Sequence, residues 1–151
     1  MISLIKQQDK TGCGLACVAM LAGIEYGRIK SIAQKHGFLV KSKNGEFYTS
    51  SSHLRCISDK VQSIEVVSLR RIKFSKIDEL PDLAILSIDN LGVKNKWHWV
   101  VFERKRDGSV YIYDPEIPKR YEKAAEIADL YITHYLVVKR KKINQVKPVA
   151  K

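Results

Sequence analysis

The feature that most constrains the fold is a change of hydrophobic pattern near residue 62 of this 151-residue chain. Before it, apolar residues recur at helical spacing. After it, short runs rich in β-branched and aromatic residues follow one another. Because the helices come first and the strands second, alternating βαβ units are excluded. The pattern predicts an α+β fold in which N-terminal helices pack on a C-terminal antiparallel sheet.

Three helices are predicted before the change. Residues 14–24 are apolar on nearly every side, which is typical of a buried helix, and Gly23 stands near its end. Residues 26–36 carry one apolar face and stop at Gly37. Residues 50–61 start with serines that can cap a helix and continue with apolar residues at helical spacing.

Strands are predicted after the change, at residues 63–69, 83–89, 97–104, 109–114 and 132–139. A single helical turn at 75–80 and a helical piece at about 119–129 interrupt them. The sequence KRDG at 105–108 predicts a hairpin turn, with Gly108 free to take a positive φ. Hydrophobic residues make up 45% of the chain, which is enough to build a core and argues against disorder.

One cysteine stands where a nucleophile is expected. Cys13 lies between Gly12 and Gly14, immediately ahead of the predicted buried helix. The start of a helix carries partial positive charge and free amide groups, so we expect the Cys13 thiol to ionise easily. The two glycines leave the backbone open to a substrate carbonyl. The alternative is a small buried apolar residue, the commoner role of a free cysteine, and we assign that role to Cys17 and Cys56.

The cysteine count also bears on cofactors and compartment. Three cysteines are an odd number, and their spacing matches no common zinc site, so we expect neither a metal nor another cofactor. A disulfide framework is not expected, which indicates a reducing compartment and hence the cytoplasm. No secretion signal is evident, and the apolar run at 15–24 is far shorter than the ~20 residues of a membrane helix.

A general base is predicted in the strand at 97–104. His98 lies in the apolar sequence WHWVV and shares a face with Val100 and Phe102 by strand alternation. A histidine in such a strand needs a polar partner. The remaining histidines have simpler structural interpretations: His36, His53 and His134.

Two further polar positions complete the candidate site. The hairpin turn brings Asp114, at the end of the next strand, beside His98, where a carboxylate can hold an imidazole in one tautomer. The alternative is that Asp114 only starts a turn with Pro115. Gln7 and Gln8 precede Cys13, and each offers a side-chain amide that can donate to a developing oxyanion.

These residues give the chain a resemblance to the C39 peptidases, the papain-like cysteine peptidase domains of bacteriocin-processing ABC transporters. Members of that family have a glutamine six positions before a Cys-Gly pair, and a second cysteine four positions after the first. They also have a histidine that opens an H-aromatic-V strand and an aspartate, followed by proline, sixteen positions later. Gln7, Cys13, Cys17, His98 and Asp114 match all of these positions.

The resemblance covers residues 1–138 and implies a papain-like fold and a cysteine peptidase. It implies Cys13 as nucleophile, His98 as base, Asp114 as orienting residue and Gln7 as oxyanion donor, with Gln8 ranked second. It further implies a peptide substrate cleaved after a Gly-Gly pair in a leader, and a transporter transmembrane domain as partner at the inner face of the membrane. Transporter-linked members usually have an acid where this chain has Gly12, which weakens the leader inference.

Two other functions stay open at this point. The first is a papain-like effector or toxin domain that uses the same thiol chemistry for proteolysis, deamidation or acyl transfer. The second is a non-catalytic nucleic-acid-binding domain, for which the net charge of +11 is the only support. Part of that charge lies in residues 139–151, which hold six basic residues and no acid. We interpret this segment as a solvated tail or linker, although such a tail can also bind anionic lipid or nucleic acid.

Overall fold

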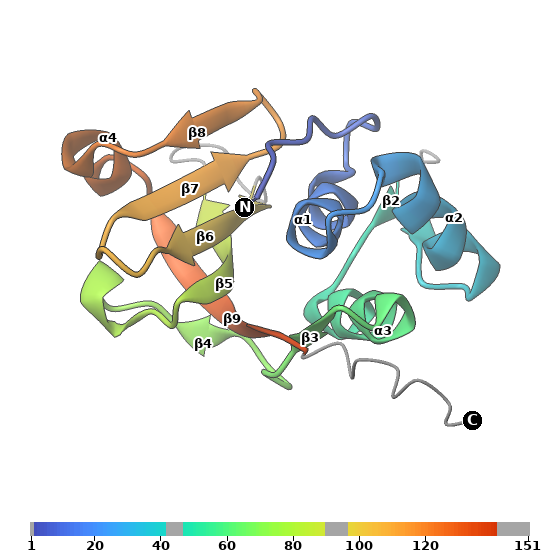
Figure 1. Ribbon diagram of the computed structural model, residues 1–151. Coiled ribbons are helices and arrows are strands. Elements are labelled where there is room, and N and C mark those ends of the chain that lie inside the picture. The colour runs from blue at the N-terminus through green and yellow to red at the C-terminus, as the bar shows by residue number, and fades with distance from the viewer. Residues whose placement is uncertain (1, 42–46, 90–96, 142–151) are drawn as a thin grey trace, which may run out of the picture.

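The computed structural model describes residues 2–41, 47–89 and 97–141. Its helices are α1 (Cys13–Ala22), α2 (Tyr26–Lys35), α3 (Ser51–Val61) and the short α4 (Ala124–Ala128), with a 3₁₀ turn η1 (Ile77–Glu79). The N-terminal helices lie together on one side of an antiparallel sheet, as Figure 1 shows. The predicted α+β architecture is therefore confirmed.

The main sheet has the order β3-β9-β5-β6-β7-β8, and β4 also pairs with β9. Its strands are β3 (Ile64–Val66), β4 (Ile72–Lys73), β5 (Leu83–Asp89), β6 (Trp97–Arg104), β7 (Val110–Asp114), β8 (Lys119–Tyr121) and β9 (Ile132–Arg140). A separate two-stranded sheet joins β1 (Val40–Lys41) to β2 (Phe47–Tyr48). All of these pairings are antiparallel.

The hairpin of β6 and β7 determines where a site can form. Gly108 has a φ of 87° and closes the predicted turn, where its N–H donates to the Lys105 carbonyl. The ladder between the two strands runs from Arg104↔Val110 to Val101↔Tyr113 and then stops. Beyond that pair, the start of β6 and the end of β7 are not joined in the ladder, which leaves backbone groups there for other partners.

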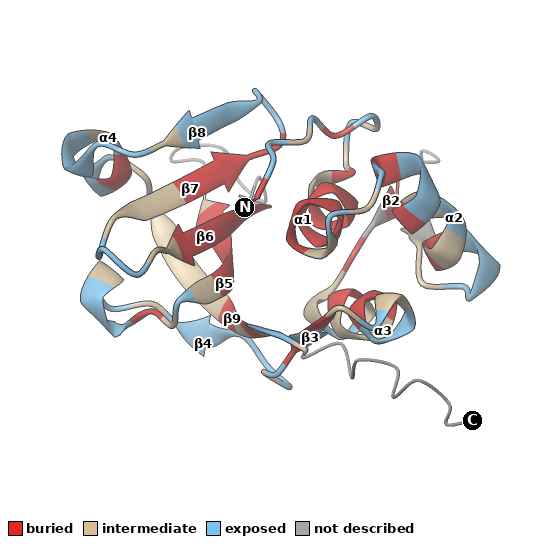
Figure 2. Cartoon of the chain, in the orientation of Figure 1, coloured by how far each residue is buried: buried red, intermediate tan, exposed pale blue. Residues whose placement is uncertain are grey.

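Apolar residues cover both faces of the sheet (Figure 2). On one face, α1 is the centre of a cluster that includes Ile85, Trp99, Val101 and Leu136 of the sheet. Every residue of α1 from Gly14 to Leu21 is buried, as its uniformly apolar sequence predicts. A second cluster lies on the opposite face, where Leu80 after η1 and Ile127 of α4 pack on side chains of β5, β6 and β7: Ala84, Leu86, Ile88, Val100, Phe102 and Ile112.

The structure corrects the predicted helical piece at 119–129. Residues Lys119–Tyr121 form β8, which pairs with the free edge of β7, and only Ala124–Ala128 are helical. The backbone groups of an unpaired strand edge favour such an addition over local helical preference. Strand β9 runs to Arg140 and pairs there with Ile64, so the expected start of the tail at residue 139 lies inside this strand. The rest of the tail, residues 142–151, lies outside the described residues.

Sequence periodicity did not predict β1, β2 or β4, because each has only two residues.

Within the described part of the chain, no helix combines the length and the apolar character needed to cross a membrane.

Candidate active site

The thiol lies at the first residue of α1. Gly12 is the N-cap of this helix, and Gly23, with a φ of 69° in the left-handed region, ends it. The Trp99 N–H of β6 donates to Cys13 Sγ at 3.4 Å. This N–H is available because the β6–β7 ladder stops at Val101. The point where the two strands part therefore holds the thiol.

The expectation that the Cys13 thiol ionises easily is wrong for this structure. Burial raises the pKa of Cys13 to about 11, although hydrogen bonds from the Trp99 and Gly14 N–H groups act in the opposite direction. The nearby negative charges of Glu116 and Asp114 raise this pKa further. The loss of water around the sulfur outweighs the partial positive charge of the helix start. The thiol is therefore protonated at neutral pH and needs a base.

The structure brings His98 and Asp114 together. Asp114 Oδ2 lies 3.0 Å from His98 Nε2, and its Oδ1 accepts a hydrogen bond of 2.8 Å from the Glu116 N–H. The exposed fractions of the two side chains are only 12% for His98 and 6% for Asp114. Burial alone would lower the pKa of His98, but the hydrogen bond and charge of Asp114, with a smaller effect of Glu116, raise it above its ordinary 6.5.

The other ring nitrogen of His98 is buried and has no hydrogen-bond partner in the described structure. No hydrogen bond between this Nδ1 and Cys13 Sγ is formed among the described residues, and the sulfur accepts instead from the neighbouring Trp99 N–H. Buried polar atoms without a partner are rare and are found at catalytic positions among others. Asp114 thus fixes one nitrogen of the ring and leaves the other available for proton transfer.

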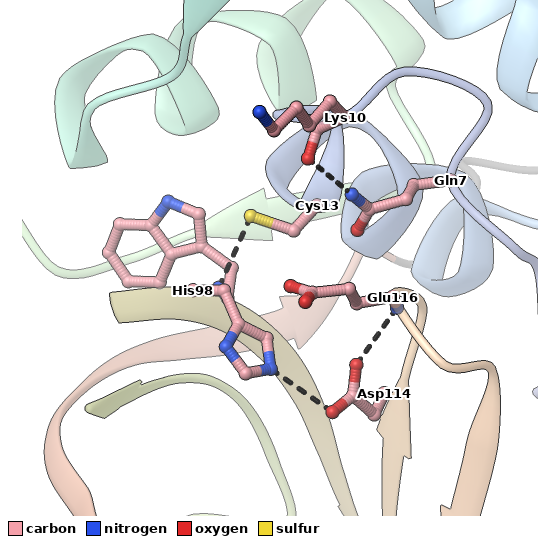
Figure 3. A network of polar contacts seen from close by, with 7 residues as sticks. Gln7, Lys10, Cys13, His98, Asp114 and Glu116 are labelled. Atoms are coloured by element: carbon pink, nitrogen blue, oxygen red, sulfur yellow. Dashed lines mark hydrogen bonds and ion pairs between the residues drawn. The ribbon is translucent and has the colours of Figure 1, made fainter. Parts of the chain in front are cut away.

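The two candidate glutamines differ in burial and in hydrogen bonding. Gln7 is 8% exposed, and its N–H donates to the Pro115 carbonyl at 3.0 Å, which places it beside the end of β7. Its side-chain Nε2 donates to the carbonyls of Asp9 at 3.0 Å and Lys10 at 2.8 Å. Figure 3 shows the Gln7 amide near Cys13. Gln8, in contrast, is exposed.

Two groups of the site were not found by sequence reasoning. The backbone N–H of Trp99 has no sequence signal, because its availability depends on where a ladder ends. Glu116 does have one: an aspartate that accepts from the N–H two residues later forms an Asx turn, and the sequence Asp-Pro-Glu is suited to it. The Glu116 carboxylate lies on the same side of the site as Cys13 and His98 in Figure 3.

Two other residues of these types, Cys17 and His53, have structural surroundings in the described fold. Cys17 is fully buried inside α1, and burial raises its pKa. His53 is part of the cap of α3, where its N–H donates to Ser50 Oγ at 3.2 Å. No group of three metal-ligating side chains occurs within the described residues.

Comparisons with known proteins agree with this architecture. A family model described as the peptidase C39 family matches residues 1–143. Two solved structures cover 93% of this chain at 17% identity and a TM-score of 0.60. One is the peptidase domain of Streptococcus ComA, a bi-functional ABC transporter involved in a quorum sensing pathway, of which 100% is covered. The other is a double glycine motif protease from an AMS/PCAT transporter in complex with the leader peptide, of which 93% is covered.

No curated protein matches the chain in a search by sequence. At 17% identity the two structures establish the fold, and the family match over most of the chain establishes the relationship. The chain therefore belongs to the peptidase C39 family and is a cysteine peptidase.

Proposed function

We propose that Cys13 is the nucleophile of this peptidase, that His98 is its general base and acid, and that Asp114 holds the imidazole in one tautomer. The supporting observation is that a helix start and a buried histidine–aspartate pair converge where β6 and β7 part. Gln7, whose amide is bonded to carbonyls of the segment just before the thiol, donates to the oxyanion together with the Cys13 N–H.

The chemistry follows from these positions. His98 Nδ1 takes the proton of Cys13 Sγ as the sulfur attacks the carbonyl carbon of the scissile bond. The resulting imidazolium is stabilised by Asp114 and gives its proton to the departing amine. Water then attacks the thioester, with His98 again as the base, and the acid product leaves.

In the described structure, the Cys13 thiol and the His98 imidazole are not hydrogen-bonded to each other. The thiol has a pKa of about 11, and its sulfur accepts a hydrogen bond from the Trp99 N–H. Hydrogen bonds of an active site often tighten only when substrate is bound. The approach of His98 to Cys13 is therefore part of our proposal for substrate binding.

For the substrate we propose a peptide with a Gly-Gly pair before the cleaved bond. The family relationship supports this class, as does the leader peptide bound by one of the structural neighbours. Trp97 is 41% exposed and packs edge-on against the buried Trp99 at 5.0 Å between ring centroids, so Trp97 can border a cleft that glycines enter. Association with a transporter and a cytoplasmic location belong to the same proposal.

Cleavage assays test this proposal. Each synthetic substrate contains a leader sequence that ends in Gly-Gly and is followed by several further residues. These peptides are incubated with the protein, and the products are analysed by mass spectrometry. The matched peptides carry Ala-Ala at the same place. Cys13→Ala should abolish cleavage after Gly-Gly, whereas Cys17→Ala, a control one helical turn away, should retain it.

A covalent probe identifies the nucleophile independently. A peptide aldehyde ending in Gly-Gly should form a thiohemiacetal on Cys13 and on neither of the other cysteines. If folded Cys13→Ala still cleaves the peptide, the proposal is wrong.

A further inference from the structure

The segment that carries Gln7 to the nucleophile is held by a charged contact that the proposed chemistry does not use. This segment, residues 7–12, precedes α1 and contains no helix or strand. Within it, the Asp9 carbonyl accepts hydrogen bonds from two groups, Gln7 Nε2 at 3.0 Å and the Gly12 N–H at 3.1 Å. One peptide oxygen therefore joins the candidate oxyanion donor to the residue before Cys13.

The side chain of this same residue is tied to α2. Asp9 Oδ2 accepts from the Tyr26 hydroxyl at 2.6 Å, and Oδ1 accepts from Lys30 Nζ at 2.8 Å. Tyr26 and Lys30 lie one turn apart on α2, so they face the carboxylate together. Lys30 is itself held near the ring of Phe47, with its Nζ 5.5 Å from the ring centroid. Both carboxylate oxygens are thus bonded to a helix that belongs to the packed core.

The contact is partly shielded from water. Tyr26 is buried, and the exposed fractions of the Lys30 and Asp9 side chains are 30% and 25%. Burial by itself would raise the pKa of Asp9, but the hydrogen bonds from Lys30 and Tyr26 and the charge of Lys30 outweigh it, and the pKa lies below its usual value. Asp9 therefore stays ionised at neutral pH, where the enzyme would work.

Gly12 shows how closely this contact approaches the nucleophile. A Cβ at Gly12 would overlap the Tyr26 hydroxyl, and it would also lie 3.3 Å from the Asp9 Cβ. The hydroxyl that bonds Asp9 therefore occupies the space that a side chain at position 12 would need. This close approach accounts for the glycine at position 12.

We infer that Asp9 is a positioning residue of this peptidase, which fixes the Gln7 amide beside Cys13 because Tyr26 and Lys30 hold its carboxylate on α2. The inference rests on the proposed function, since it acts through the oxyanion donor. When an oxyanion forms, it is a stronger acceptor than a peptide carbonyl, so Gln7 exchanges one of its two hydrogen bonds without leaving its position. Without the carboxylate, the segment and the amide would have to be ordered during the reaction.

A double-mutant cycle tests this inference. In the wild-type background, Asp9→Ala should lower kcat by about tenfold with little change in KM, because misplacing a catalytic group by about 1 Å costs up to about 10²-fold. In the Gln7→Ala background, the same substitution should change kcat by less than about twofold. Asp78→Ala, which removes an exposed carboxylate on η1, is the control and should change neither parameter. Equal losses in the two backgrounds would overturn the inference, since Asp9 would not act through Gln7.

Amide hydrogen exchange supplies a measurement that does not need cleavage. Asp9→Ala should accelerate exchange in residues 7–13 and leave α3 unchanged, whereas Asp78→Ala should accelerate neither. Unchanged exchange in residues 7–13 would overturn the inference. If the wild-type protein cleaves no peptide, the proposed function fails, and the exchange experiment still decides whether the Asp9 carboxylate orders this segment.

Discussion

Replacing Asp114 with asparagine should reverse the direction in which the pKa of His98 is shifted. The substitution keeps the size of the side chain and an acceptor for the Glu116 N–H, and it removes the negative charge 3.0 Å from His98 Nε2. Burial is the largest single influence on His98 and lowers its pKa; Asp114 opposes it, and Glu116 contributes least. Without the Asp114 charge, burial dominates, so the pKa of His98 should fall below 6.5.

The size of the electrostatic attraction supports this reversal. Two opposite charges 3.0 Å apart attract by about 5 kcal/mol at an effective dielectric constant of about 20. Desolvation of the imidazolium opposes that attraction, and the net shift of the His98 pKa in the wild-type protein is upward. A single pKa unit corresponds to about 1.4 kcal/mol, so losing even part of the attraction is measurable.

The assay is an NMR titration of the histidine ring signals in the wild-type and Asp114→Asn proteins. The ring signals of His134 provide an internal control and should titrate identically in both proteins. If His98 titrates above 6.5 in the variant as well, Asp114 is not the cause of its raised pKa, and the role of Asp114 as orienting residue loses its main support.

The same pair makes stability depend on pH. Because the pKa of His98 is raised by folding, its contribution to stability is fully present below 6.5 and is lost as the pH rises through the folded-state value. Asp114→Asn should therefore destabilise the protein by about 2–3 kcal/mol near pH 5.5, where a hydrogen bond to a charged group is lost. Near pH 9 the imidazole is neutral and only its hydrogen bond to the Asp114 carboxylate is lost, so the loss should be smaller, about 1.5 kcal/mol. Urea unfolding at the two pH values measures this difference, and a greater loss at high pH would contradict it.

Three further outcomes follow from the site and the tail. Gln7→Ala should lower kcat by about 10²–10³-fold in the cleavage assay, whereas Gln8→Ala, at an exposed position, should leave it nearly unchanged; the reverse order would contradict the oxyanion assignment. Iodoacetamide should label Cys13 well before the fully buried Cys17, at a rate that rises as the pH approaches about 11. Peptide mapping measures the labelling of each cysteine, and equal labelling of the two would contradict this prediction. Removing residues 143–151 should leave the melting temperature unchanged, and a large decrease would show that the tail packs on the domain.

The sequence predicted the elements with a clear period and missed those that depend on tertiary pairing. The α1 run is apolar on every side, and the β5 and β6 runs are continuous, so their positions agree with prediction within a residue or two. Strand β8 carries the exposed sequence Lys-Arg-Tyr, which has no strand signal, and it forms because the edge of β7 is free. The intrinsic preference of a segment determines its secondary structure only where tertiary contacts favour no alternative. For residues 119–121, pairing with β7 determined the structure instead.

For the candidate site, the sequence indicated which residues meet but not the state of the thiol. The hairpin turn and the end of β7 were enough to place Asp114 beside His98. The pKa of Cys13 could not be predicted in the same way, because the position at a helix start is visible in the sequence and the loss of water around the sulfur is not. Burial is a property of the whole fold, and at Cys13 it outweighs the local effect.

The candidate site combines residues from a helix and from the sheet. The relative positions of its side chains therefore depend on residues that lie away from the thiol. Helix α1 supplies the thiol, whereas β6 and β7 supply the proposed base, His98, and its partner, Asp114. The helix is fixed to the sheet by buried apolar contacts, but the segment before the helix has no such core of its own. It is held at one end by the Gln7 N–H on the Pro115 carbonyl and in its middle by the Asp9 carboxylate on α2. The proposed oxyanion donor, Gln7, is therefore held through ties both to the end of the strand that carries Asp114 and to a helix remote from the thiol.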